Sequence, residues 1–239
     1  MVIKREIYFV ATIIIAIGAV LGTYMYFGTN SEEGRQSSLL YGDFQKSAKS
    51  KTNQVSLPLP NSTTDHLLGD AKSRLVLIEY VDFMCPYCKK FTPVIGSILS
   101  AYKGKVALVY RNFPLPHHDP LATDSAISAE CVAKITGNDA YWKFTRALFN
   151  DQSNQTRDAK YFGSMAKNAG SDGEKVIKCF QKRETIVKIV DEFNLGLDLG
   201  IKGTPTSFLY DTKTGETTLI TGSIDEKKLS SYIDQLLAK

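Results

Sequence analysis

The chain has 239 residues, a formal net charge of +4 and a hydrophobic content of 43%. This hydrophobic share is ordinary for a globular protein, and the mild positive charge is not gathered into a Lys/Arg block, so the sequence gives no support for nucleic-acid binding. The four cysteines, an even number, fit an oxidising compartment if the chain is exported.

An apolar, uncharged run at residues 7–27 is long enough to cross a hydrocarbon core about 30 Å thick. Lys4 and Arg5 precede this run and acidic residues follow it. The positive-inside rule therefore predicts a cytoplasmic N-terminus at residues 1–6, a single-pass membrane anchor, and an extracytoplasmic remainder. A cleaved signal peptide is the alternative, but the run is long for a signal peptide and shows no clear cleavage site.

Residues 28–60 are rich in Ser, Gly, Gln, Asn and Lys and show no sustained hydrophobic period. This composition is typical of a flexible tether. We therefore place the folded domain at residues 61–239, with residues 65–73 as a polar lead-in to the first strand.

A strand–helix–strand unit opens the folded domain. Residues 74–83 predict a buried strand, residues 86–102 a helix, and residues 106–113 a second strand. The near-continuous apolar run of the second strand is typical of a parallel sheet that is covered on both faces. We expect a βαβ unit with a right-handed crossover.

Helical patterns fill the next eighty residues. The first helix is expected to run to about residue 135, with Asp119 as its N-cap and Pro120 at its first position. Further helices are predicted at residues 139–149, 158–168, 172–180 and 184–199. A hairpin at residues 206–210 and 217–221 and an amphipathic helix at 225–237 complete an α/β order of βαβ, a helical insertion at about 117–200, and ββα.

The sequence Cys85-Pro86-Tyr87-Cys88 lies where the first strand gives way to a helix. The unpaired N–H groups and the dipole at a helix start stabilise a thiolate, and Pro86 suits this position because it lacks an N–H. Because the thiolate is the reacting species in disulfide exchange, we expect a redox pair. Half of a zinc site is one alternative, although structural zinc usually needs a second pair or two His; an inert bridge is another.

These elements resemble the thioredoxin fold with an inserted helical domain, as in DsbA-like thiol–disulfide oxidoreductases. The resemblance covers about residues 67–237. It is carried by the Cys85–Cys88 motif, by Arg-Asn-Phe-Pro-Leu at residues 111–115, and by Gly-Ile-Lys-Gly-Thr-Pro-Thr at residues 200–206. The combination of a Cys-x-x-Cys with a Gly-Thr-Pro-Thr that opens a strand more than a hundred residues later is specific.

The resemblance implies a role for each matching residue. It makes Cys85 the exposed attacking thiol and Cys88 the resolving thiol. It makes Pro205 a cis-proline beside the active disulfide, and Thr204 the residue whose backbone pairs with an extended substrate. Glu79, six residues before the first thiol, matches the buried acid that handles the Cys88 proton. The alternatives are a partly exposed strand residue with no role at Glu79 and an ordinary trans turn at Pro205.

Cys131 and Cys179 are expected to face the interior of the insertion. Some members of the family that the chain resembles carry a second disulfide between two insertion helices, so the resemblance implies a bond here; two separate buried thiols are the alternative. His117 and His118 are expected to be a polar loop that enters the insertion. No metal ion and no cofactor are expected.

The resemblance implies a thiol–disulfide oxidoreductase, and the apolar run at residues 7–27 predicts that it is tethered to the cell membrane. Its expected substrates are unfolded exported proteins with free thiols, and its expected partner is a quinone-linked membrane protein of the DsbB or VKOR type that re-oxidises the pair. An oxidase is expected, but Tyr87 stands where the family's strong oxidant has His, which predicts a milder oxidant and leaves a reductase or isomerase open. A redox-inactive binding module or chaperone is an alternative of another class, and the intact motifs argue against it.

Overall fold

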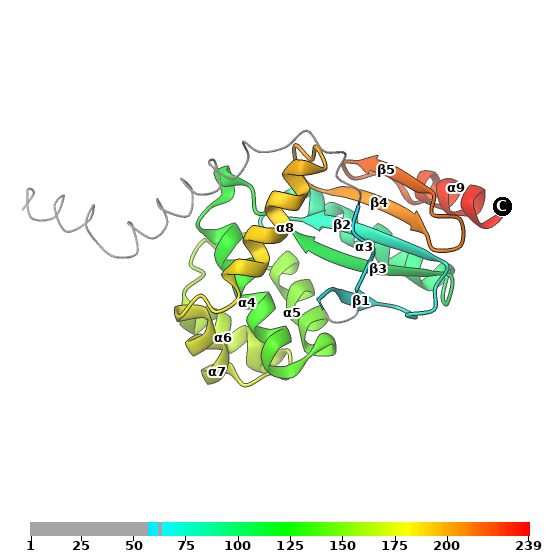
Figure 1. Ribbon diagram of the computed structural model, residues 1–239. Helices are drawn as coiled ribbons and strands as arrows, with labels where there is room; N and C mark the ends of the chain where they lie inside the picture. Colours follow the sequence, from blue (N-terminus) through cyan, green and yellow to red (C-terminus); the bar gives the residue numbers. More distant parts are fainter. Residues whose placement is uncertain (1–56, 62–63) are drawn as a thin grey trace, which may run out of the picture. The chain divides into compact units, whose positions relative to one another are not determined.

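The computed structural model describes residues 57–61 and 64–239 (Figure 1). The predicted anchor at residues 7–27 and nearly all of the predicted tether lie outside these residues. Within the described residues, no helix combines the length and the apolar character that a membrane crossing needs.

The core of the fold is a five-stranded mixed sheet in the order β1-β3-β2-β4-β5. Its central strand, β2, runs parallel to β3, and every other neighbouring pair is antiparallel. This arrangement is the predicted βαβ unit joined to the predicted hairpin. The strands are β1 (His66–Leu68), β2 (Leu75–Val81), β3 (Val106–Asn112), β4 (Thr206–Asp211) and β5 (Thr217–Thr221).

Strand β1 corrects the sequence prediction, which treated residues 65–73 as a lead-in without a strand. It pairs antiparallel with β3, with Leu67 opposite Val109. A three-residue strand is too short for side-chain alternation to reveal it, because the pairing depends on the edge that β3 offers.

Helices α3 (Pro86–Ala101) and α9 (Glu226–Leu237) contact each other, and their apolar residues join the core cluster of the sheet. The predicted helical insertion lies between β3 and β4. Figure 1 shows α4, α5, α6 and α7 gathered beside the sheet, with α8 leading back to β4. The insertion contains η1 (Pro116–His118), α4 (Leu121–Thr136), α5 (Asn138–Asn150), α6 (Ala159–Asn168), α7 (Gly173–Gln181) and α8 (Ile186–Asp198).

Three helices begin at the aspartates that the sequence analysis placed at their starts. Asp158, Asp172 and Asp225 are the N-caps of α6, α7 and α9, and each side chain accepts the N–H of the third residue after it. An N-cap of this kind satisfies one of the helix's unpaired donors and typically contributes about 1 kcal/mol.

The start of α4 differs from the prediction. Pro120, expected at the first helical position, is the N-cap, and the helix begins one residue later at Leu121. Asp119 still caps the helix through its side chain, because its Oδ1 accepts the N–H of Thr123 at 3.0 Å and the Thr123 hydroxyl at 2.6 Å. The Asp119–Pro120 peptide bond is cis.

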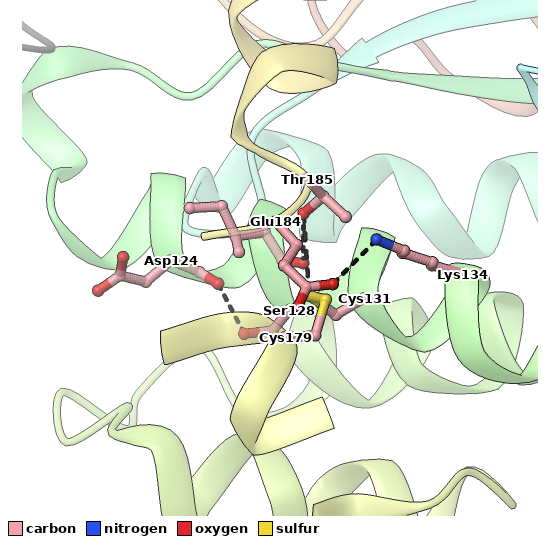
Figure 2. Close-up of a disulfide and its surroundings, with 8 residues drawn as sticks. Asp124, Ser128, Cys131, Lys134, Cys179, Glu184 and Thr185 are labelled. Carbon is pink, nitrogen blue, oxygen red and sulfur yellow. Dashed lines mark hydrogen bonds and ion pairs between the residues drawn. A yellow bond between two sulfur atoms is a disulfide. The ribbon is translucent and has the colours of Figure 1, made fainter. Parts of the chain in front are cut away.

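A disulfide joins Cys131 of α4 to Cys179 of α7, the pairing that the resemblance implies (Figure 2). Both cysteines are buried, at 0% and 3% exposure. The adjoining Glu184 and Thr185 add polar contacts with α4: the Thr185 hydroxyl donates to the Ile127 carbonyl at 3.1 Å, and Lys134 and Glu184 form an ion pair at 2.9 Å. The bond therefore lies inside the insertion, where it links two of its helices.

Candidate active site

The site lies where β2 ends and α3 begins. All seven residues of β2 are buried, which fixes the strand within the sheet. Asp82 then turns the chain, since its Oδ1 accepts the Met84 N–H at 2.7 Å. Cys85 takes the N-cap position of α3, and Pro86 occupies the first helical position, as the sequence predicts. The first thiol is thereby held at the positive end of a sixteen-residue helix.

The surroundings of Cys85 lower the pKa of its thiol from 9.0 to about 5. The largest cause is a hydrogen bond from the Cys88 side chain, which outweighs the opposing effect of burial. The backbone N–H groups of Cys88 and Tyr87 lower the pKa further. At neutral pH Cys85 is therefore a thiolate.

Cys88 has the opposite character. Its side chain is fully buried, and burial raises the pKa of its thiol well above the ordinary value. The hydrogen bond with Cys85 and the negative charge of Glu79 raise this pKa further. Neither residue takes part in a disulfide in this structure. The pair therefore consists of one reactive anion and one protonated partner.

The exposure of Cys85 corrects the expectation of an exposed thiol. Only 3% of the residue is accessible, whereas Tyr87 beside it is 62% exposed. The cover includes Thr204, whose carbonyl oxygen lies 3.3 Å from the Cys85 Sγ. A substrate sulfur must displace part of this cover to reach Cys85.

The Thr204–Pro205 peptide bond is cis, as the resemblance implies. Pro205 is buried and lies directly before β4. The loop that carries it meets the start of α3 through the contact between the Thr204 carbonyl and the Cys85 Sγ. The Thr206 hydroxyl donates to the Gly203 carbonyl at 2.7 Å and fixes this loop. The structure thus brings together the two motifs, more than a hundred residues apart, on which the resemblance rests.

Glu79 lies in the middle of the sheet and is 1% exposed, so the alternative of a partly exposed strand residue is wrong. It stands in register between Tyr110 of β3 and Ser207 of β4. Within the described part of the chain, its Oε2 has no hydrogen-bond partner. Burial, and then the negative charge of Cys85, hold the pKa of the Glu79 carboxyl well above its usual range.

A family model described as thioredoxin matches residues 61–235. The chain belongs to the thioredoxin family. It is similar to the crystal structure of DsbA2 from Pseudomonas aeruginosa, with 30% identity and a TM-score of 0.61 over 75% of this chain and 97% of that one. It is also similar to alpha-DsbA1 from Wolbachia pipientis, with 27% identity and a TM-score of 0.65 over 78% and 96%. BdbD from Bacillus subtilis shares the fold at 22% identity, with a TM-score of 0.66 over 78% and 100%.

Curated relatives of this thioredoxin-family chain include longer proteins. It is 29% identical over 147 residues to the Na(+)/H(+) antiporter NhaA 1 of Mycolicibacterium vanbaalenii, a match of 61% of this chain and 23% of that protein. It is 26% identical over 204 residues to NhaA 1 of Salinispora arenicola, a match of 84% and 29%. The chain therefore spans less than a third of the length of these two relatives.

Asp82 and His118 form a contact beside the Cys85–Cys88 motif. The sequence did not predict this contact. The His118 Nδ1 lies 2.7 Å from the Asp82 Oδ2, which also accepts the Leu115 N–H at 2.8 Å. The histidine expected in a polar entry loop therefore ties η1 to the turn before Cys85. An acidic residue that interrupts an apolar run directly before the motif was the available signal.

Replacing Glu79 with leucine is expected to stabilise the reduced protein at neutral and alkaline pH. The raised pKa of Glu79 means that the folded state holds a proton that the unfolded state has already released, so this acid lowers stability as pH rises from its unfolded pKa through its folded pKa. An unsatisfied buried polar group costs roughly 1–3 kcal/mol, and we expect a gain of that size at pH 8.

Urea unfolding of the reduced wild type and Glu79→Leu at pH 5 and pH 8 checks this. The gain should be larger at pH 8. Glu79→Gln is the matched control, since it keeps the shape of the side chain and removes the titration. Its stability relative to wild type should therefore also rise between pH 5 and pH 8, as it does for Glu79→Leu. A Glu79→Leu protein that loses stability at pH 8 would contradict the assignment of an unpaired buried acid.

Proposed function

We propose that this protein is an extracytoplasmic thiol–disulfide oxidoreductase that works as an oxidase of exported proteins. The observation that carries the proposal is the contrast between the two thiols of one motif, in which the pKa of Cys85 is about 5 and that of Cys88 is raised. A sulfur with a low pKa is a good leaving group, so a mixed disulfide at Cys85 is easily resolved by a second substrate thiolate. The DsbA relatives support this assignment.

The proposed reaction begins with the Cys85–Cys88 disulfide. A substrate thiolate attacks the Cys85 sulfur, the bond between the two enzyme sulfurs breaks, and Cys88 leaves and takes up a proton. A second substrate thiolate then attacks the substrate sulfur of the mixed disulfide and releases Cys85 as a thiolate. The substrate has lost two electrons and gained a disulfide, and the enzyme pair has been reduced.

Glu79 is proposed to exchange the proton of Cys88 in this reaction. Its raised pKa keeps it protonated to higher pH than an exposed glutamate. When it is ionised, its negative charge raises the pKa of the Cys88 thiol. A protonated acid beside a departing sulfur can supply the proton that the buried thiolate requires. Thr204 is proposed to offer its backbone to the substrate segment next to Cys85.

The membrane placement is also a proposal. It is supported by the apolar run at residues 7–27 and the basic residues that precede it. A tether at residues 28–60 would keep the domain near emerging exported chains and near a quinone-linked re-oxidising partner of the DsbB or VKOR type.

The reduction potential of the Cys85–Cys88 pair, measured by equilibration with glutathione, tests the direction of the reaction. A reduction potential closer to about −120 mV than to about −270 mV is expected for an oxidase. Because Tyr87 favours a milder oxidant, the potential should be more negative than about −120 mV. A value near about −270 mV would instead support a reductase. A pair that never forms a disulfide in oxidised glutathione would favour a redox-inactive binding module.

A further inference from the structure

The helical insertion meets the redox motif at the end of α5. Gln152, in the turn that follows this helix, donates from its Nε2 to two carbonyl oxygens of the motif's turn: Phe83 at 3.1 Å and Cys85 at 2.9 Å. A primary amide nitrogen carries two hydrogens, so one side chain can serve both acceptors. Next to this contact the ring of Phe149 packs on Phe83, with ring centroids 5.3 Å apart.

Gln152 is presented by a turn that is itself anchored. The buried guanidinium of Arg157 donates to the carbonyl oxygens of Leu148 at 3.1 Å and Asp151 at 2.8 Å, and to the Ser125 hydroxyl at 2.7 Å. Arg157 is only 4% exposed, so these bonds are shielded from water. The turn is therefore tied to both α4 and α5, which places the Gln152 amide against the motif.

The Cys85 carbonyl is also the first acceptor of α3. It receives the Lys89 N–H at 3.2 Å in addition to the Gln152 amide. A second hydrogen bond joins α3 to the insertion one helical turn after Cys85. There the Lys89 Nζ donates to the carbonyl of Asn150, the last residue of α5, at 3.3 Å. Both contacts hold the first turn of α3, whose N–H groups face the Cys85 sulfur.

We propose that Gln152 is a positioning residue through which the helical insertion sets the redox equilibrium of the Cys85–Cys88 pair. Its amide hydrogens place positive partial charge beside the negative end of the Cys85 carbonyl dipole. They also hold the first turn of α3 in the orientation that stabilises a thiolate. Both effects favour the reduced, anionic form, so the insertion makes the pair more oxidising. This inference rests on the proposed redox activity and names a residue that the activity alone does not assign.

Gln152→Glu tests the proposal because it changes the donor amide into an acceptor carboxylate of the same shape. The carboxylate repels both carbonyl oxygens and adds negative charge near the thiolate. The reduced form is therefore destabilised relative to the disulfide form. We expect the equilibrium constant with glutathione to shift at least tenfold toward the disulfide form, equivalent to about 30 mV more negative for this two-electron couple. The pKa of Cys85, followed by thiolate absorbance, should rise in the same variant.

Gln155→Glu is the matched control. Gln155 lies two residues after the same turn and is exposed, and within the described residues its side chain donates one hydrogen bond, from its Nε2 to the Gln152 backbone carbonyl at 3.4 Å. The same charge change there should shift the equilibrium less than twofold. Equal shifts in the two variants would overturn the proposal, because a general charge effect would then explain both.

Gln152→Ala keeps the test decisive if the glutamate variant does not fold. It removes the two bonds without adding charge and should shift the constant about threefold in the same direction. If Gln152 were only a structural tie, urea unfolding would show lost stability with an unchanged constant, and the proposal would fall. A wild-type pair that does not equilibrate with glutathione would instead refute the proposed function, which separates the two failures.

Discussion

Replacing Cys85 with serine is expected to abolish thiol–disulfide exchange completely. The serine oxygen cannot form a disulfide, and the remaining Cys88 is fully buried with a raised pKa, so it supplies little thiolate. The measurement is the oxidation rate of a reduced peptide with two cysteines, with oxidised glutathione as the terminal oxidant for wild type and variant alike, followed by acid quench. The variant should not exceed the rate of buffer alone.

Cys88→Ser is the matched variant three residues away, and its expected result differs. It keeps the reactive Cys85 and lacks the resolving thiol. When the disulfide-linked dimer of a one-cysteine peptide is added, the Cys85 thiolate attacks one peptide sulfur and releases the other peptide as a thiolate, so the mixed disulfide should accumulate on non-reducing gels. Exchange by the Cys85→Ser protein, or mixed disulfides that form equally on both variants, would show that the roles of the two thiols are assigned wrongly.

Removal of the Cys131–Cys179 disulfide should produce the largest loss of stability. The two cysteines are 48 residues apart, and closing a loop of this length lowers the free energy of folding by about 4 kcal/mol in the chain-entropy model. We expect the double variant Cys131→Ala, Cys179→Ala to lose about that much in urea unfolding under oxidising conditions.

The same comparison under strongly reducing conditions is the control, since the wild type then lacks the bond as well and the gap should nearly close. Alkylation gives a second check. When only the active-site pair has been reduced, denaturing alkylation should label Cys85 and Cys88 and leave Cys131 and Cys179 unlabelled. Four labelled thiols would show that the disulfide does not form in solution.

Much of the architecture was predictable from local signals. β2 and β3 are buried along their whole length, and their continuous apolar runs reflect this burial directly. Asp158, Asp172 and Asp225 mark helix starts because capping depends on residues within one turn. The Cys85–Cys88 motif and Pro205 were recognisable because the residues around each match motifs of the family that the chain resembles.

The contacts that set the chemistry were not predictable, because they join segments far apart in the chain. The Thr204 carbonyl that covers Cys85, the His118 that meets Asp82, and the Gln152 that meets the motif's turn act across 119, 36 and 69 residues respectively. Each depends on how the insertion and the β4 loop pack on the start of α3. Hydrophobic period and motif spacing carry no information on that packing.

The start of α3 and its neighbours hold Cys85 as an anion at neutral pH, and the proposed chemistry requires this anion. Thiolate absorbance of the reduced protein near 240 nm, titrated between pH 3 and pH 10 against the oxidised protein as blank, measures this directly. We predict a midpoint at a pKa of about 5 for Cys85, with no second midpoint until well above the ordinary value because Cys88 stays protonated. A single midpoint near about 8.5, the value of a free cysteine, would contradict the account.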